Sequence, residues 1–133
     1  MIENRVIIHS DGVSRGNPGP AAIGAIIVDG SGRLLATISR RIGRATNNQA
    51  EYRAVIAALE EAIKLGARQV VLCSDSELIV RQIRGDYRVK KQALKPLYWR
   101  QKQLQGSLEN FTIKHIPRQQ NKEADRLANK AFE

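Results

Sequence analysis

The sequence predicts one α/β domain whose elements follow the order βββ-α-β-α-α-β-α. Three observations predict this class: apolar runs separated by turns near the start, a long helical pattern with a capping box, and a wholly apolar run at residues 70–73. A short run of that kind is typical of a strand buried on both faces of a sheet. With 133 residues and neither an internal repeat nor a linker, the chain fits a single domain over residues 1–133.

The first three elements are strands, predicted at residues 6–10, 22–28 and 34–42. We expect the first strand to end at Asp11-Gly12, where a glycine- and proline-containing loop begins and runs to Pro20. Residues 29–32, Asp-Gly-Ser-Gly, form a hairpin turn between the second and third strands. The three strands are therefore expected to form an antiparallel meander.

A long helix is predicted from Asn47 to Leu65, because Thr46 and Gln49 have the spacing of a capping box and Gly66 can end the helix. The remaining elements are a strand at residues 70–73, a helix at 76–84, a helix at 94–104, a strand at 111–115 and a helix at 122–132. Pro96 is compatible with this assignment since it falls in the first turn of its helix.

The net charge and the cysteine count indicate which kind of partner and which cellular compartment to expect. Lysine and arginine number 22 against 13 acids, a net charge of +9, which favours a polyanionic partner. The single cysteine excludes an internal disulfide and fits a reducing cytoplasm. The longest charge-free stretch, residues 16–28, is too short and too rich in glycine and proline to cross a membrane, and the first residues lead into a strand rather than a signal peptide.

Four acids stand near the ends of predicted elements: Asp11, Glu51, Asp75 and Asp125. The two strand-end aspartates are placed where ligands bind in α/β sheets, beyond the carboxyl ends of strands. Glu51 and Asp125 lie in first turns, on the apolar faces of their helices. Brought together, four carboxylates would repel one another unless a hard divalent cation such as Mg²⁺ or Mn²⁺ joined them.

Each acid also has a simpler interpretation. Asp-Gly after a strand is usually a turn, and an acid in the first turn of a helix usually interacts with the helix dipole. Ser74-Asp75-Ser76 can cap the following helix. Spacing alone does not show that the four acids meet.

The acids lie in distinctive local sequences: residues 9–20 contain DG…GNPGP, and residues 46–51 read Thr-Asn-Asn-Gln-Ala-Glu. These segments resemble the first motif of type 1 ribonuclease H and the TNNxxE helix start of that family. Ser74-Asp75-Ser76 matches the third motif, and residues 115–128 are similar to the last, H-x-P-R…N-x-x-A-D. The motifs occur in the family's order and span nearly the whole chain.

The resemblance implies a ribonuclease H-like fold, with a five-stranded mixed sheet of three antiparallel and two parallel strands. It implies that Asp11, Glu51, Asp75 and Asp125 are the catalytic, metal-binding acids. Two Mg²⁺ ions, with Mn²⁺ as an alternative, would then act on the RNA strand of an RNA–DNA hybrid and leave 5′-phosphate and 3′-hydroxyl ends. His115 matches the family's loop histidine, which moves a proton or helps product leave, although spacing alone favours a solvated histidine at a strand end. Arg118 is the alternative for contacting phosphate.

The resemblance also implies nucleic-acid contacts, at Gly12, Asn17, Thr46, Asn48, Gln49 and Ser76. Contacts in the minor groove would detect the 2′-hydroxyl of RNA. The capping box, and a helix cap at Ser76, are structural alternatives for three of these residues.

The chain departs from the pattern of many family members, because the connection at residues 85–92 is too short for their basic insertion. Residues 81–102 nevertheless contain eight basic residues and one acid, a net charge of +7, with Tyr87, Tyr98 and Trp99 among them. Basic residues interleaved with aromatics suit a strand-binding surface, and Lys90 and Lys91 are candidates for this contact. The alternative is a solvated helix face.

We therefore expect a monomeric cytoplasmic endoribonuclease acting on RNA–DNA hybrids, with RNA–RNA duplexes as an additional substrate class. The first alternative is a non-catalytic hybrid- or duplex-binding module on the same fold. Another is a different nuclease or integrase of the same fold that acts on DNA or double-stranded RNA. An ATP-binding relative is disfavoured, since the sequence contains neither GxxxxGK nor GxGxxG.

Overall fold

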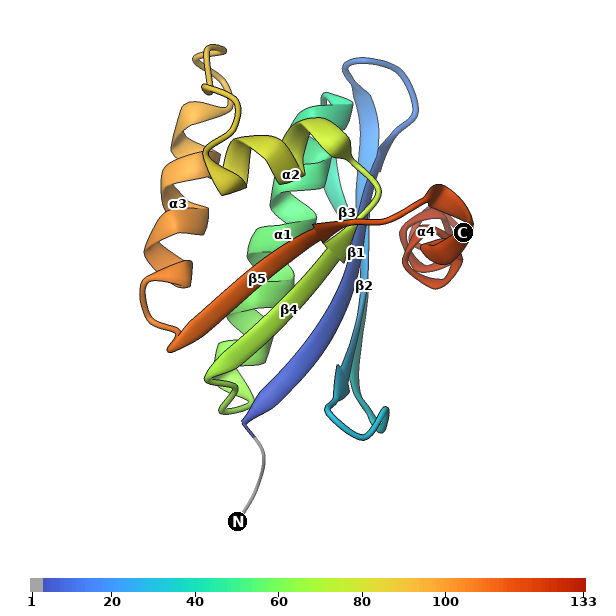
Figure 1. Cartoon of the computed structure of the whole chain (residues 1–133). Coiled ribbons are helices and arrows are strands. Elements are labelled where there is room, and N and C mark those ends of the chain that lie inside the picture. The colour runs from blue at the N-terminus through green and yellow to red at the C-terminus, as the bar shows by residue number, and fades with distance from the viewer. Residues whose placement is uncertain (1–3) are drawn as a thin grey trace.

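One five-stranded sheet organises the chain, and its strands lie in the order β3-β2-β1-β4-β5 (Figure 1). The computed structural model describes residues 4–133. The strands are β1 (Arg5–Ser14), β2 (Gly19–Asp29), β3 (Leu34–Ala45), β4 (Gln69–Ser74) and β5 (Asn110–His115). β2 is antiparallel to both β1 and β3, whereas β4 is parallel to both β1 and β5. The predicted mixed sheet and order of elements are thus confirmed.

The helices cover the two faces of the sheet unequally. Three of them, α1 (Asn47–Lys64), α2 (Glu77–Arg84) and α3 (Lys95–Gln105), lie on one side, and α4 (Lys122–Lys130) lies on the other (Figure 1). A single 3-10 turn, η1 (Arg118–Gln120), which the sequence did not predict, leads from β5 into α4. In residues 4–133, none of the helices combines the length and the apolar character needed to cross a bilayer.

The long helix α1 begins as predicted, with a complete capping box. The Gln49 N–H donates to Thr46 Oγ1 at 3.2 Å, and the Thr46 N–H donates to Gln49 Oε1 at 2.8 Å. Its apolar face packs on the sheet, where Leu59 of α1 and Ile8 and Leu72 of the strands are fully buried. Burial stabilises each such side chain by about 1.5–3 kcal/mol. This face also carries Glu51, which is only 5% exposed, toward the sheet.

The expectation that β1 ends at Asp11 is wrong. β1 continues to Ser14, because β2 pairs with it as far as Ser14↔Ala21, and Asp11 is paired with Gly24 within this ladder. The neighbour on the other side, β4, pairs with β1 only as far as His9↔Cys73. Asp11 therefore lies inside a strand, yet just past the point where the parallel half of the sheet stops.

Other boundaries differ by a few residues. β3 runs three residues past the predicted end, to Ala45, through an irregular pairing near Ala21 and Ala22. α4 ends at Lys130, two residues before the predicted end. The prediction that no signal peptide opens the chain rests on residues 1–5. Residues 1–3 lie outside the described residues, and β1 begins at Arg5.

Candidate active site

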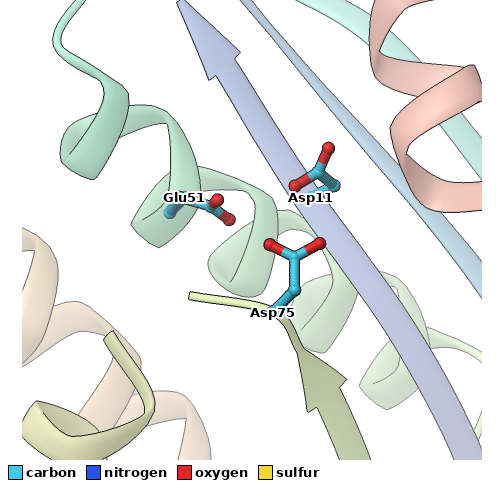
Figure 2. A group of neighbouring side chains, drawn as sticks. All are labelled: Asp11, Glu51 and Asp75. Atoms are coloured by element: carbon cyan, nitrogen blue, oxygen red, sulfur yellow. The ribbon is translucent and has the colours of Figure 1, made fainter. Parts of the chain in front are cut away.

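Three of the four predicted acids meet at one edge of the sheet (Figure 2). Each of Asp11, Glu51 and Asp75 offers a carboxylate oxygen, and these three oxygens lie within 4.8 Å of one another. Asp11 comes from β1, Glu51 from the second turn of α1 rather than the expected first turn, and Asp75 from the residue after β4. The side chains point toward one another from three different elements (Figure 2).

A glycine allows the first two acids to approach. Gly12 follows Asp11 on β1, and a Cβ built on it would lie 2.2 Å from the backbone carbon of Ala50 in α1. Only glycine lets strand and helix pack this closely. The Gly12 N–H also donates to Glu51 Oε1 at 3.1 Å, so the strand that carries Asp11 holds the Glu51 carboxylate directly. The predicted nucleic-acid contact of Gly12 remains untested; the residue itself is buried.

The cluster strongly disfavours the ionised forms of Asp11 and Glu51. Burial, followed by the charges of Glu51 and Asp75, raises the pKa of Asp11 to about 9. Burial and the charge of Asp75 raise the pKa of Glu51 to about 8, against the opposing effects of the Gly12 N–H and the Arg118 guanidinium. Both raised pKa values favour the neutral acid, so the site stabilises the two carboxylates only when a cation compensates their charge.

The fourth acid, Asp125, lies outside the group of three but beside Asp11. Its side-chain contact with Asp11 and its charge both contribute to raising the pKa of Asp11. Asp125 is half-buried in the first turn of α4, and its Oδ1 accepts a hydrogen bond from Asn129 Nδ2 at 3.2 Å. Gly24 of β2 permits this placement, since a Cβ there would lie 2.2 Å from the Ala124 carbonyl oxygen of α4.

Sequence reasoning missed one residue of the site, Asn121. Its side chain is buried and donates to Asp75 Oδ2 at 3.1 Å and to the Ser10 carbonyl at 2.9 Å. The residue stood inside the last motif, as the asparagine of N-x-x-A-D, and this was the only signal available.

The two candidates for assisting the reaction lie at the end of β5 and in the turn that follows it. His115 is the last residue of β5, is exposed, and is paired with Ser74, next to Asp75. Arg118 is exposed in η1, and its charge lowers the pKa of Glu51. The Arg118 guanidinium therefore interacts electrostatically with the Glu51 carboxylate of the acidic cluster.

The candidate nucleic-acid contacts gather around the start of α1. Asn17, in the β1–β2 loop, accepts a hydrogen bond from the Asn47 N–H at 3.0 Å, so this loop is fastened to the helix. Thr46 and Gln49 form the capping box, while Asn48 is half-exposed beside them. Ser76 caps α2, with its Oγ accepting from the Ile79 N–H at 3.4 Å, as the structural alternative predicted.

Six of the eight basic residues of segment 81–102 fall into two groups. Arg81 pairs with Glu77 at 3.0 Å, Arg100 pairs with Glu60 at 3.0 Å, and Lys102 Nζ donates to the Ile83 carbonyl. The second group, Arg88, Lys90 and Lys91, is exposed and lines a cavity of about 570 Å³ together with Asn48 and Tyr87. This second group forms a basic wall beside the start of α1.

Comparison with known proteins agrees with this geometry. Residues 9–131 match the family model described as "Reverse transcriptase-like". The chain is 44% identical over 129 residues to ribonuclease HI of Halobacterium salinarum, covering 97% of this chain and 65% of that protein. The crystal structure of RNase H1 from the same archaeon has a TM-score of 0.94 to this chain, covering 96% of this chain and 97% of the other.

The chain belongs to the type 1 ribonuclease H family. The predicted resemblance and ribonuclease H-like fold are thereby confirmed. Another ribonuclease H of this type, LC11-RNase H1, was crystallised with an RNA/DNA hybrid; its TM-score is 0.90 at 44% identity, with 95% of each chain covered. The chain is also 45% identical over 131 residues to the "Bifunctional protein Rv2228c" of Mycobacterium tuberculosis. The chain spans 36% of that protein and 65% of the archaeal ribonuclease HI, so both relatives contain further sequence outside the matched region.

The donor set of this ribonuclease H site fits a hard divalent cation. Its three convergent ligands are all carboxylates, and oxygen ligands are those that Mg²⁺ and Mn²⁺ prefer. The buried acids Asp11 and Glu51 cannot ionise together without a compensating charge, and a bound cation would provide it.

Proposed function

We propose that this chain is a metal-dependent endoribonuclease that hydrolyses the RNA strand of RNA–DNA hybrids and leaves 5′-phosphate and 3′-hydroxyl ends. The observation that carries the proposal is the meeting of Asp11, Glu51 and Asp75 at one edge of the sheet, in a chain of the type 1 ribonuclease H family. The crystallisation of LC11-RNase H1 with an RNA/DNA hybrid supports this substrate class.

The proposed cofactor is Mg²⁺, two ions in the substrate complex, with Mn²⁺ as an alternative. Asp11, Glu51, Asp75 and Asp125 would hold them, since three of these acids converge and the fourth lies beside Asp11. When bound, the ions supply Lewis-acid polarisation of the scissile phosphodiester and lower the pKa of a water molecule. The Gly12 N–H keeps the Glu51 carboxylate turned toward Asp11.

Two exposed residues, His115 at the end of β5 and Arg118 in η1, would act on the reacting phosphate. Arg118 lies close enough to Glu51 to affect its charge, and its guanidinium suits a phosphate oxygen. His115, exposed next to the Asp75 edge, would transfer a proton to or from the leaving group or help product leave.

The hybrid would lie across the start of α1. Asn17, Asn48 and Gln49 would contact its minor groove, where the 2′-hydroxyl identifies RNA, and Thr46 and Ser76 would contact the backbone. The capping box uses Thr46 Oγ1 and Gln49 Oε1 as acceptors, so the hydroxyl and amide protons remain for a ligand. Lys90 and Lys91, in the basic wall, would bind phosphates of the DNA strand.

Matched RNA–DNA, RNA–RNA and DNA–DNA duplexes, each incubated with Mg²⁺, Mn²⁺ or a chelator, test this proposal. We expect cleavage of the RNA strand of the hybrid with either ion, some cleavage of RNA–RNA duplexes, and none with chelator. Binding of the hybrid without cleavage in Mg²⁺ would instead identify a non-catalytic binding module. Cleavage of DNA duplexes would identify a different nuclease.

We further propose that the chain works as a monomer in the cytoplasm. Its single cysteine, Cys73, is buried in β4, and burial raises the pKa of its thiol, which makes it a poor nucleophile for forming disulfides. Size-exclusion chromatography with light scattering tests the oligomeric state, and a dimer would refute this part of the proposal.

A further inference from the structure

Asn121 is buried at the point where three chain segments of the site meet. It is 1% exposed and directly precedes α4. Its side-chain nitrogen is shared between the Ser10 carbonyl of β1, at 2.9 Å, and Asp75 Oδ2, at 3.1 Å. Its own carbonyl accepts the Asp125 N–H at 3.1 Å.

The orientation of the Asn121 amide follows from its neighbours. A backbone carbonyl and a carboxylate oxygen can both only accept, so the donor end of the amide must face them. A hydrogen bond from an amide to a carboxylate is charge-assisted, and it is directional as well as stronger than a neutral one. Asp75 therefore has one of its two oxygens fixed by Asn121.

Asn121 in this way touches the immediate environment of three acids. Ser10 is the residue before Asp11, the Asp75 carboxylate is contacted directly, and the Asp125 backbone begins its helix on the Asn121 carbonyl. Within residues 4–133, Asn121 is the one side chain that donates hydrogen bonds to both the Asp75 carboxylate and the strand that carries Asp11.

A helix cap does not explain this residue. Although Asn121 occupies the N-cap position of α4, its side chain makes no capping hydrogen bond. Its Oδ1 is buried without a hydrogen-bond partner within the described residues, and such a group lowers stability. An apolar residue of similar size would avoid that cost, so the asparagine is poorly explained by stability and well explained by its contact with Asp75.

We propose that Asn121 is a positioning residue that orients the Asp75 carboxylate for metal binding and links it to the strand of Asp11. The effect of Asn121 on catalysis rests on the proposed function. Its effect on metal binding rests on the hydrogen bond from Asn121 to Asp75. Partners that orient metal ligands typically contribute 10–100-fold to metal affinity, roughly the loss we expect on removing the amide.

The test uses Asn121→Leu, which has the same number and branching of side-chain heavy atoms but no polar ones, and Asn121→Ser, which keeps a short donor. Asn110→Ser, at an exposed asparagine at the start of β5, is the matched control. The apparent Kd for MnCl₂ and for MgCl₂ is measured from the metal-induced rise in Tm, and kcat and KM are measured on a hybrid at saturating metal. The same Kd is measured for Asn121→Leu in an Asp75→Asn background.

We expect Asn121→Leu to raise the metal Kd about 10–100-fold and to lower kcat, with KM for the hybrid within about twofold of the original. Asn121→Ser should fall between, and Asn110→Ser should match the original protein. In the Asp75→Asn background, Asn121→Leu should change the Kd no further, because the partner carboxylate is gone.

An unchanged metal Kd in either folded variant would overturn the proposal, as would an equal loss in the Asp75→Asn background. A failure of both variants to fold would also overturn it, by showing a structural role. If the original protein binds metal but leaves hybrids intact, the proposed function fails, whereas the Kd comparison still decides the role of Asn121.

Discussion

Replacing Gly12 with alanine should push apart two acids of the cluster. The added Cβ would lie 2.2 Å from the Ala50 carbon and 2.4 Å from the Glu51 nitrogen, where ordinary contact begins at 3.4 Å. Both contacts are backbone atoms, so no side-chain rotation can relieve them. The start of α1 must therefore move from β1 by about 1.2 Å, the difference between 2.2 Å and 3.4 Å.

The size of the effect follows from that displacement. Overpacking of this kind costs about 1–3 kcal/mol of unfolding free energy, which would lower Tm by roughly 4–12 °C in a chain of this size. The hydrogen bond from the Gly12 N–H to Glu51, now 3.1 Å, would be stretched beyond bonding distance. A misplacement of about 1 Å at catalytic groups costs about 100-fold in rate, and we expect that loss in hybrid cleavage.

Thermal unfolding by circular dichroism and single-turnover cleavage of a labelled hybrid measure the two effects. The control is Gly106→Ala, because the new Cβ there would meet its nearest atoms at 3.5 Å and the backbone has an ordinary helical φ of −64°. Gly106→Ala should stay within about twofold in rate. A Gly12→Ala protein that matched this control in Tm and in rate would refute the reasoning that the strand–helix approach sets the spacing of the acids.

Three more outcomes are expected. Asp75→Asn should reduce cleavage at least about 1000-fold while leaving the circular dichroism spectrum unchanged, and full activity would contradict a role in catalysis. Without metal, the free energy of unfolding should fall as pH rises from about 4 to about 9. The folded-state pKa values of Asp11 and Glu51, about 9 and about 8, lie above their unfolded values. In this window the folded state therefore binds more protons than the unfolded state, and raising the pH favours unfolding. Urea unfolding in EDTA measures this: the unfolding free energy should change by up to about 1.4 kcal/mol per pH unit for each proton, and by less in Asp11→Asn. An unfolding free energy that does not depend on pH in the original protein would be inconsistent with buried, coupled acids. The Lys90→Gln/Lys91→Gln pair should weaken hybrid binding and reduce the slope of log K against log salt by up to about two, and an unchanged slope would exclude the basic wall from the interface.

Local patterns predicted the parts of this protein that depend on local chemistry. The capping box of Thr46 and Gln49 is a contact across one helical turn, so both the residues and their bonds could be read from the sequence. The hairpin at Asp29 is equally local, since its Oδ1 accepts from the Ser31 and Arg33 N–H groups.

What the sequence could not predict depends on contacts between distant segments. Asp-Gly resembles a turn, but β1 passes through Asp11 because β2 supplies hydrogen bonds there. The role of Gly12 depends on the position of α1, and that of Asn121 on the position of Asp75, 46 residues away. Neither the approach of Gly12 to α1 nor that of Asn121 to Asp75 follows from the residue spacing within a single helix or strand.

The four acids enter the chain in a fixed order, and this has a consequence during protein synthesis. Asp11 lies near the start of the described chain, whereas Asn121 and Asp125 follow only after β5. A chain synthesised only as far as Asp75 contains three of the acids in its sequence, but it lacks the amide that contacts Asp75 and the acid beside Asp11. The proposed catalytic centre is therefore complete only when α4 packs on β2, so the last helix to be synthesised supplies its final components.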